Sequence, residues 1–189
     1  MKYKIALFIF TSVVLCNCYM PGLTTHYKNV KKAGTSPFNC EMKNESSTKG
    51  IIEIKAQDVR NCYLIGNNKI TWIIILYYDC MGSIYDSYNL YKKYKDDFNF
   101  LVISENYDVD KIKAEERKVG HPIFFIDHTN HWMRTKNSQL FVEEIFGKDV
   151  PKEATYSSQI FVFNDKIIKT GFTGMINERF IDSLHNATF

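Results

Sequence analysis

The chain has no excess of charge of either sign. Its 189 residues include 24 Lys and Arg against 21 Asp and Glu, and the basic count falls to 22 when Lys2 and Lys4 at the amino terminus are set aside. Basic pairs such as Lys31-Lys32 and Lys92-Lys93 are separated along the chain by acidic residues. No basic stripe that could follow a phosphate backbone is expected, which excludes nucleic acid as a partner.

Internal repeats and low-complexity tracts are also lacking, and there are only four prolines. Hydrophobic residues make up 45% of the chain and aromatic residues 15%. General disorder is therefore excluded, and a core that contains β-strands is favoured. The length fits one globular domain with a tail rather than two domains.

The apolar run at residues 5–15 is too short to span a bilayer comfortably. It follows the positively charged start Met1-Lys2-Tyr3-Lys4, and this order is typical of a secretory signal peptide. The sequence therefore predicts a signal peptide over residues 1–18.

The signal peptide ends in Leu15-Cys16-Asn17-Cys18. This resembles the lipobox of bacterial lipoproteins, in which a Cys preceded by Leu three positions earlier is acylated and becomes residue one. The resemblance implies lipidation at Cys18, with Asn17 in place of the usual small residue, and Cys16 fits less well because Leu15 would fill the small-residue position. A plain secretory signal and an uncleaved anchor are the alternatives. We expect a protein of the cell envelope, lipid-anchored to a bacterial membrane and facing the periplasm or exterior, in an oxidising compartment.

Residues 19–49 show no sustained apolar period and mix Pro, Gly, Thr, Asn and Lys. They are predicted to form a tether or an irregular lead-in, followed by one domain over residues 50–189. Within that domain, apolar runs predict strands at 51–54, 62–65, 70–78, 98–103, 121–126, 159–163 and 166–171. Helices are expected from about 79, from Asp108 to Lys118, from Ser138 to Phe146, and after Asn177. The alternation predicts an α/β fold with a mostly parallel sheet, closed by a hairpin at Asn164-Asp165.

The order of strand, Cys at a helix start, strand, helix, strand, helix, hairpin and terminal helix is similar to the thioredoxin fold. The stretch from Ile160 to Ile181, with Gly171 and Gly174, resembles the closing strands and helix of that superfamily. The chain looks most like the membrane-anchored thiol-disulfide proteins (TlpA/redoxin-like). The resemblance implies a central mixed sheet flanked by helices, with an α/β insertion before the final hairpin and helix.

The same resemblance places a catalytic thiol at Cys80, in the stretch Cys80-Met81-Gly82-Ser83. Ser83 takes the resolving position of a Cys-x-x-Cys motif, and Ser158 stands where the superfamily has a cis-proline. Unsatisfied N–H groups at a helix start lower a thiol pKa from about 8.5, whereas the neighbouring Asp79 opposes that effect. Ser83 can donate a hydrogen bond to the thiolate. The residues expected to bind substrate around Cys80 are Tyr78, Met81, Ser157 and Ser158.

Cys40 and Cys62 are the remaining thiols of the processed chain. A structural disulfide between them, two free thiols, and a redox relay with Cys80 are all compatible with the sequence. The stretch Asp127-His128-Thr129-Asn130-His131 is interpreted as a surface turn rather than a metal site, so no metal and no cofactor are expected. A peroxidase is excluded because Tyr77 and Ile73 stand where peroxiredoxins have Thr or Ser and Pro.

These features of the sequence support two candidate functions. The first is a monothiol protein that exchanges or isomerises disulfides of a protein or peptide partner through Cys80. The second is a redox-inactive lipoprotein that uses a thioredoxin scaffold and a rim of tyrosines to bind a peptide or protein. The tyrosines near Cys80 in the sequence are Tyr77, Tyr78, Tyr85, Tyr88, Tyr91 and Tyr94.

Overall fold

A computed structural model describes residues 30, 33–44, 50–77, 83–105, 107–127, 134–172 and 174–188. In chain order its elements are β1 (Thr35–Pro37), the 3-10 turn η2 (Cys40–Asn44), β2 (Ile51–Ile54), α3 (Ala56–Val59), the π-helical turn η3 (Arg60–Leu64), β3 (Ile70–Leu76), α4 (Ser83–Lys93), β4 (Phe98–Ser104), α5 (Val109–Val119), β5 (Phe124–Ile126), α6 (Arg134–Phe146), α7 (Lys152–Tyr156), β6 (Gln159–Phe163), β7 (Lys166–Gly171) and α8 (Glu178–Thr188). Of the helices so described, none combines the length and apolar character needed to cross a membrane.

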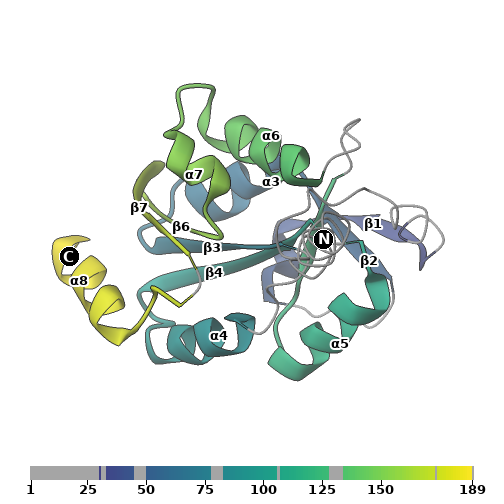
Figure 1. The fold of residues 1–189 in the computed structure, drawn as a ribbon, viewed down its shortest axis with the longest axis horizontal. Helices are drawn as coiled ribbons and strands as arrows, with labels where there is room; N and C mark the ends of the chain where they lie inside the picture. Colours follow the sequence, from purple (N-terminus) through teal and green to yellow (C-terminus); the bar gives the residue numbers. More distant parts are fainter. Residues whose placement is uncertain are drawn as a thin grey trace, which may run out of the picture.

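The strands form one mixed sheet of seven, in the order β1-β2-β5-β4-β3-β6-β7. The first five strands of that order are parallel, β6 runs antiparallel to β3, and β7 runs antiparallel to β6. Figure 1 shows α3, α6 and α7 on one face of the sheet and α4, α5 and α8 on the other. The predicted α/β class, a mixed sheet flanked by helices, is confirmed.

Strand β3 is an inner strand of the sheet, with a neighbour on each side, as its continuous apolar run predicts. All seven of its residues are buried. It pairs with β4 along its full length, from Ile70 opposite Phe98 to Leu76 opposite Ser104, and with β6 on its other side. Because side chains alternate along a strand, β3 contributes to two separate cores: Ile73 and Ile75 join one, and Trp72, Ile74 and Leu76 join the other.

Local signals fix the ends of several elements as expected. The Asp108 carboxylate accepts a hydrogen bond from the Lys111 N–H (3.2 Å) and caps α5, and the Asn177 side chain does the same for the Phe180 N–H (3.1 Å) at α8. Asn164 and Asp165 both have positive φ, 49° and 62°, as the tight turn of a two-residue hairpin requires.

The prediction of a strand at residues 62–65 is wrong, because residues 62–64 belong to the helical turn η3, which directly continues α3. Buried positions at Ala56, Val59, Cys62 and Tyr63 recur every three to four residues, whereas the intervening Arg60 and Asn61 are exposed. The apolar run at residues 62–65 by itself fits the period of a strand, but the longer window from Ala56 has the period of a helix.

Two further boundaries differ from the sequence prediction. The strand expected from His121 is restricted to Phe124–Ile126, since Pro122 has no N–H to donate to a ladder. The helix expected from Ser138 already begins at Arg134. Its buried residues include Phe141 and Ile145, as expected, while Leu140 and Phe146 are half-buried.

Residues 33–44 differ from the expected tether, because they are built onto the domain. β1 pairs in parallel with β2, which otherwise would be the edge of the sheet, and the Phe38 N–H donates to the Glu53 carbonyl (2.9 Å). Phe38 is buried and meets Phe124 edge-on, with 5.0 Å between ring centroids. Val30 is also fully buried, so apolar anchors hold part of the lead-in.

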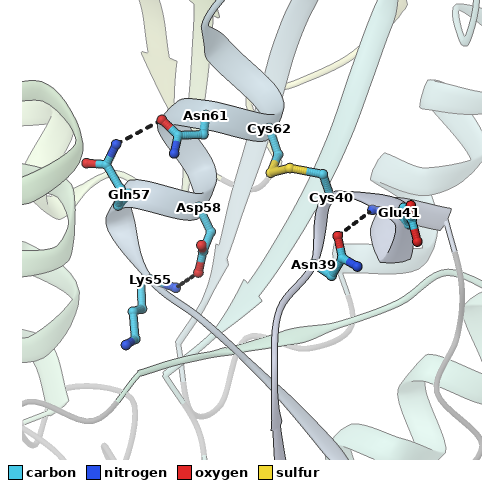
Figure 2. The surroundings of a disulfide bond; sticks show 8 residues. All are labelled: Asn39, Cys40, Glu41, Lys55, Gln57, Asp58, Asn61 and Cys62. Atoms are coloured by element: carbon cyan, nitrogen blue, oxygen red, sulfur yellow. Dashed lines mark hydrogen bonds between the residues drawn. A yellow bond between two sulfur atoms is a disulfide. The ribbon is translucent and has the colours of Figure 1, made fainter.

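A disulfide joins Cys40 to Cys62, which connects η2 to η3 (Figure 2). The two Cα atoms lie 5.4 Å apart, in the usual range for a disulfide, and the cysteines are 22 residues apart in sequence. Cys62 is buried and Cys40 is exposed. The bond therefore ties the amino-terminal segment to the helix that precedes β3.

Removing this disulfide should lower the free energy of unfolding by about 3 kcal/mol, because the unfolded chain gains the freedom of the loop that the bond closes. The measurement is urea unfolding of the wild type and of the double variant Cys40→Ala/Cys62→Ala, each with and without dithiothreitol. We expect the reductant to destabilise the wild type and to leave the double variant unchanged. Equal stability of the two proteins without reductant would contradict the structural role.

His121 is a buried ionisable side chain that packs against the core containing Trp72, Ile74 and Leu76. It is 5% exposed and lies among rings of α4 and β4, with centroid distances of 5.3 Å to Tyr88 and 5.1 Å to Phe100. Its Nε2 atom has no hydrogen-bond partner among the described residues. Desolvation lowers the pKa of His121 to about 4, against a smaller opposing effect of a backbone hydrogen bond at Phe100.

The stability of the fold should therefore fall as the pH is lowered from about 6.5 to 4. The imidazole takes up a proton near pH 6.5 in the unfolded chain but only near 4 in the folded one, so acid favours unfolding by about 3 kcal/mol over this interval. Urea unfolding as a function of pH tests this with His121→Gln, which should flatten the profile. His185→Gln, at a partly exposed site, is the control, and parallel curves for wild type and His121→Gln would contradict the prediction.

Candidate functional site

The carboxyl ends of β3, β4 and β5 lie together along one edge of the sheet. This edge is formed by the ends of strands and not by an outer strand. The helices that follow β3 and β4 pack on one face, whereas those that follow β2 and β5 pack on the other (Figure 1). In open α/β sheets, ligands bind outside the carboxyl ends of the strands, where the connections change faces. This edge is therefore the candidate functional site.

Tyr77 and Glu105 lie side by side at this edge. Each directly follows its strand, and the register that sets Leu76 opposite Ser104 sets Tyr77 opposite Glu105. The Glu105 N–H donates to the Leu76 carbonyl (3.4 Å), which extends the ladder by one step. Alternation directs both side chains to the face of Ile75 and Ile103, towards α6. Glu105 is only 2% exposed, which is unusual for a carboxylate.

The Tyr77 hydroxyl connects three elements. It donates a hydrogen bond to the Ser157 carbonyl (3.3 Å), before β6, and it is hydrogen-bonded by the Ser138 side chain on α6. Ser138 and the adjacent Asn137 are both buried. Burial raises the pKa of Tyr77 and the negative charge of Glu105 raises it further, while the hydrogen bond from Ser138 opposes the rise. Tyr77 therefore stays a neutral phenol over the physiological range.

Ser157 and Ser158, expected to bind substrate, are both buried next to the end of β3. The Ser158 carbonyl accepts a hydrogen bond from the Ile75 N–H (2.8 Å), and the Ser157 hydroxyl donates to the Glu153 carbonyl in α7 (2.6 Å). The structure therefore brings the two serines to the strand whose continuation carries Cys80. Among the described residues no peptide bond is cis.

Cys80, Tyr78 and Met81 lie outside the described residues, as does the expected lipidation site Cys18. The described chain ends on one side at Tyr77, directly after β3, and resumes on the other at Ser83, the first residue of α4. Ile84, one residue into the helix, is fully buried. By chain order, Cys80 belongs to the link between the carboxyl end of β3 and α4.

Three large apolar side chains are exposed near this edge. Gly171 at the end of β7 pairs with Gln159 at the start of β6, so Phe172 follows the strand opposite Ser158. Phe172, Met175 and Tyr156 are 54%, 64% and 58% exposed. Tyr156 directly precedes Ser157 in the chain, and the Met175 N–H donates to the Phe172 carbonyl (3.0 Å). We call these three exposed side chains the apolar rim.

The tyrosines of α4, and Tyr94 directly after it, mostly contribute to packing. Tyr91 stacks on Phe100, with centroids 4.7 Å apart, and the Tyr94 hydroxyl donates to the Asp182 carboxylate of α8 (2.6 Å). Tyr85 is 45% exposed, whereas Tyr88 lies against His121. These side chains fix α4 to the sheet and to α8.

The part of the chain that the structure describes holds no cluster of three or more His, Cys, Asp or Glu side chains suited to a metal ion. Asp127, at the end of β5, forms an ion pair with Lys55 at 3.8 Å. His128 and His131 lie outside the described residues. The other end of the sheet has a pocket of about 120 Å³, lined by Arg60, Leu64, Ile65, Ile145, Phe146 and Asp165.

Sequence reasoning did not single out Glu105 and Ser138 as part of a site. The sequence does show a carboxylate, Glu105, directly after an apolar strand. This position indicates a site only when the neighbouring strands of the sheet are known.

Comparison with protein-family models, curated proteins and solved structures finds no match to this chain.

Proposed function

We propose that the chain is a thioredoxin-like protein of the cell envelope that exchanges disulfides through the single thiol of Cys80. The observation that carries the proposal is the position of the link 78–82, between the carboxyl end of the buried inner strand β3 and the start of α4. A parallel neighbour on one side of β3, an antiparallel hairpin on the other, and a terminal helix support the thioredoxin-like fold.

A monothiol site suits disulfide isomerisation. The Cys80 thiolate attacks one sulfur of a disulfide in a protein or peptide partner, a new S–S bond forms, and the other sulfur of the partner leaves as a thiolate. A second thiolate of the partner then attacks its own sulfur in this mixed disulfide and releases the Cys80 thiolate. No net oxidation or reduction occurs, so Ser83 in the resolving position is compatible with turnover.

The apolar rim of Tyr156, Phe172 and Met175 favours a polypeptide as the partner, because large exposed apolar side chains can contact the side chains of another protein. The same rim supports the second candidate, a redox-inactive binding module. Both functions use the same edge of the sheet, and they differ in whether Cys80 reacts.

Alkylation of Cys80 should separate the two functions. We expect the rate with iodoacetamide, followed on the Cys80 peptide by mass spectrometry, to report a thiol pKa below 8.5, because the start of α4 stabilises the thiolate. Mixed disulfides trapped from cell-envelope extracts should be present with the wild type and absent with Cys80→Ala. A thiol pKa of 8.5 or above together with no Cys80-dependent mixed disulfide would exclude the enzymatic function and leave the binding module.

The proposed lipid anchor has its own test. Cys18→Ala should release the protein from the membrane fraction, because the acyl chains are what hold the processed chain there. Cys16→Ala is the matched control and should leave the protein membrane-bound. Release by Cys16→Ala but not by Cys18→Ala would identify Cys16 as the acylated residue. Membrane retention of the double variant Cys16→Ala/Cys18→Ala would contradict lipid anchoring.

A further inference from the structure

We propose that the pocket between η3, the carboxyl end of α6 and the β6–β7 turn binds a small zwitterion, an α-amino acid with a short aliphatic side chain. The proposal is independent of the thiol function, because the pocket lies at the other end of the sheet. The residues that line it all belong to the described part of the chain: Arg60, Leu64, Ile65, Ile145, Phe146 and Asp165.

Contacts between η3 and α6 hold a cationic side chain at the pocket. Arg60 is the first residue of η3, and Ile145 and Phe146 end α6. The Arg60 Nη1 atom donates a hydrogen bond to the Ile145 carbonyl (2.9 Å), and the Arg60 carbonyl accepts one from the Ile65 N–H (2.9 Å). The guanidinium is therefore held at the end of α6, among the apolar residues that line the pocket.

The β6–β7 turn brings a carboxylate to the same pocket. β6 runs antiparallel to β3 and pairs Val162 with Thr71, so the turn that follows β6 lies at the amino end of β3. Asp165 is the second residue of this turn, with a φ of 62°. The pocket thus receives a cation and an anion from segments that are far apart in the sequence.

Neither charge is neutralised by an ion pair. Within the described part of the chain, no salt bridge joins Arg60 to Asp165 or either of them to another side chain. A guanidinium has five N–H donors, of which the Ile145 carbonyl takes one, and a carboxylate has only acceptors. The pocket therefore offers donors to a carboxylate and acceptors to an ammonium group. A free α-amino acid carries both groups on one carbon atom.

The volume of the pocket limits the size of the ligand. An apolar cavity of about 150 Å³ holds a benzene molecule, so a pocket of about 120 Å³ suits a side chain smaller than a benzene ring. The other lining residues, Leu64, Ile65, Ile145 and Phe146, are apolar. An aliphatic side chain such as that of valine meets both conditions.

The experiment titrates the ¹⁵N-labelled full-length protein, solubilised in detergent, with L-valine. The amide signals of Leu64, Ile65 and Phe146 should shift and saturate. Arg60 and Asp165 are exposed, so each ion pair with the ligand contributes modestly, and we expect a dissociation constant on the order of 1 mM.

Two modified ligands test the two charges separately in the wild-type protein. N-acetyl-L-valine lacks the ammonium group and resembles the carboxyl end of a peptide, whereas L-valinamide lacks the carboxylate and resembles the amino end. Each should bind about fivefold more weakly than L-valine, because it loses one of the two ion pairs.

Asp165→Asn should weaken L-valine binding about fivefold, since it removes the charge and keeps a residue that tolerates a positive φ. Asp149→Asn is the matched control: Asp149 is exposed and does not line the pocket, so this variant should bind as the wild type does. Arg60→Gln should also weaken binding about fivefold. Because Arg60 holds the end of α6, circular dichroism must show that this variant is folded.

Three outcomes would overturn the proposal. The first is the absence of saturable shifts at the pocket amides up to the solubility limit of L-valine. The second is a modified ligand that binds as tightly as L-valine, which would show that the pocket recognises a single charge, as at one end of a peptide. The third is an equal effect of Asp165→Asn and Asp149→Asn on binding. None of these results bears on the reactivity of Cys80.

Discussion

The pairing of β3 with β4 is the constraint on which the remaining structure depends. Seven consecutive residues of β3 are buried, and each faces a partner in β4. A strand with no exposed face must receive helices on both sides, because each face presents apolar side chains. The two cores, the helices that cover them and the meeting of the carboxyl ends of the strands at one edge all follow from this arrangement.

At that edge, polar side chains follow the apolar residues of the strands. Tyr77, Glu105, Asn137, Ser138 and Ser157 introduce polar atoms into a layer that the covering helix α6 largely closes from water. Polar groups in such a place are tolerated when they bond to one another. The cluster therefore specifies the relative positions of β3, β4, α6 and the segment before β6 more narrowly than apolar packing alone.

Much of this fold was predictable from local patterns. The uninterrupted run of β3, the capping residues Asp108 and Asn177, and the turn at Asn164-Asp165 each act within a few residues, so the sequence alone reveals them. The helix at residues 56–64 was missed because a short apolar run fits either period. The β1 strand was missed because its stability comes from pairing with β2 and from buried Phe38, which are long-range effects.

The candidate site was less predictable, for the same physical reason. Glu105 and Ser138 are ordinary polar residues in the sequence, and only the parallel register and the packing of α6 bring them to Tyr77. Pairing of Cys40 with Cys62 was one of three possibilities, and the choice among them depends on a Cα separation that the sequence does not contain.

Groups of opposite electrostatic effect lie at the end of β3 and at the start of α4, the two elements that the link 78–82 joins. The amino-terminal end of α4 favours a negative charge, whereas the buried Glu105 places a carboxylate beside the end of β3. For the thiol exchange that we propose, such a balance would be an advantage, because nucleophilicity falls as the thiol pKa falls and the most effective attacking thiol has a pKa near the ambient pH. A monothiol site, which must also release its partner without a second cysteine, is best served by a thiol that is activated moderately.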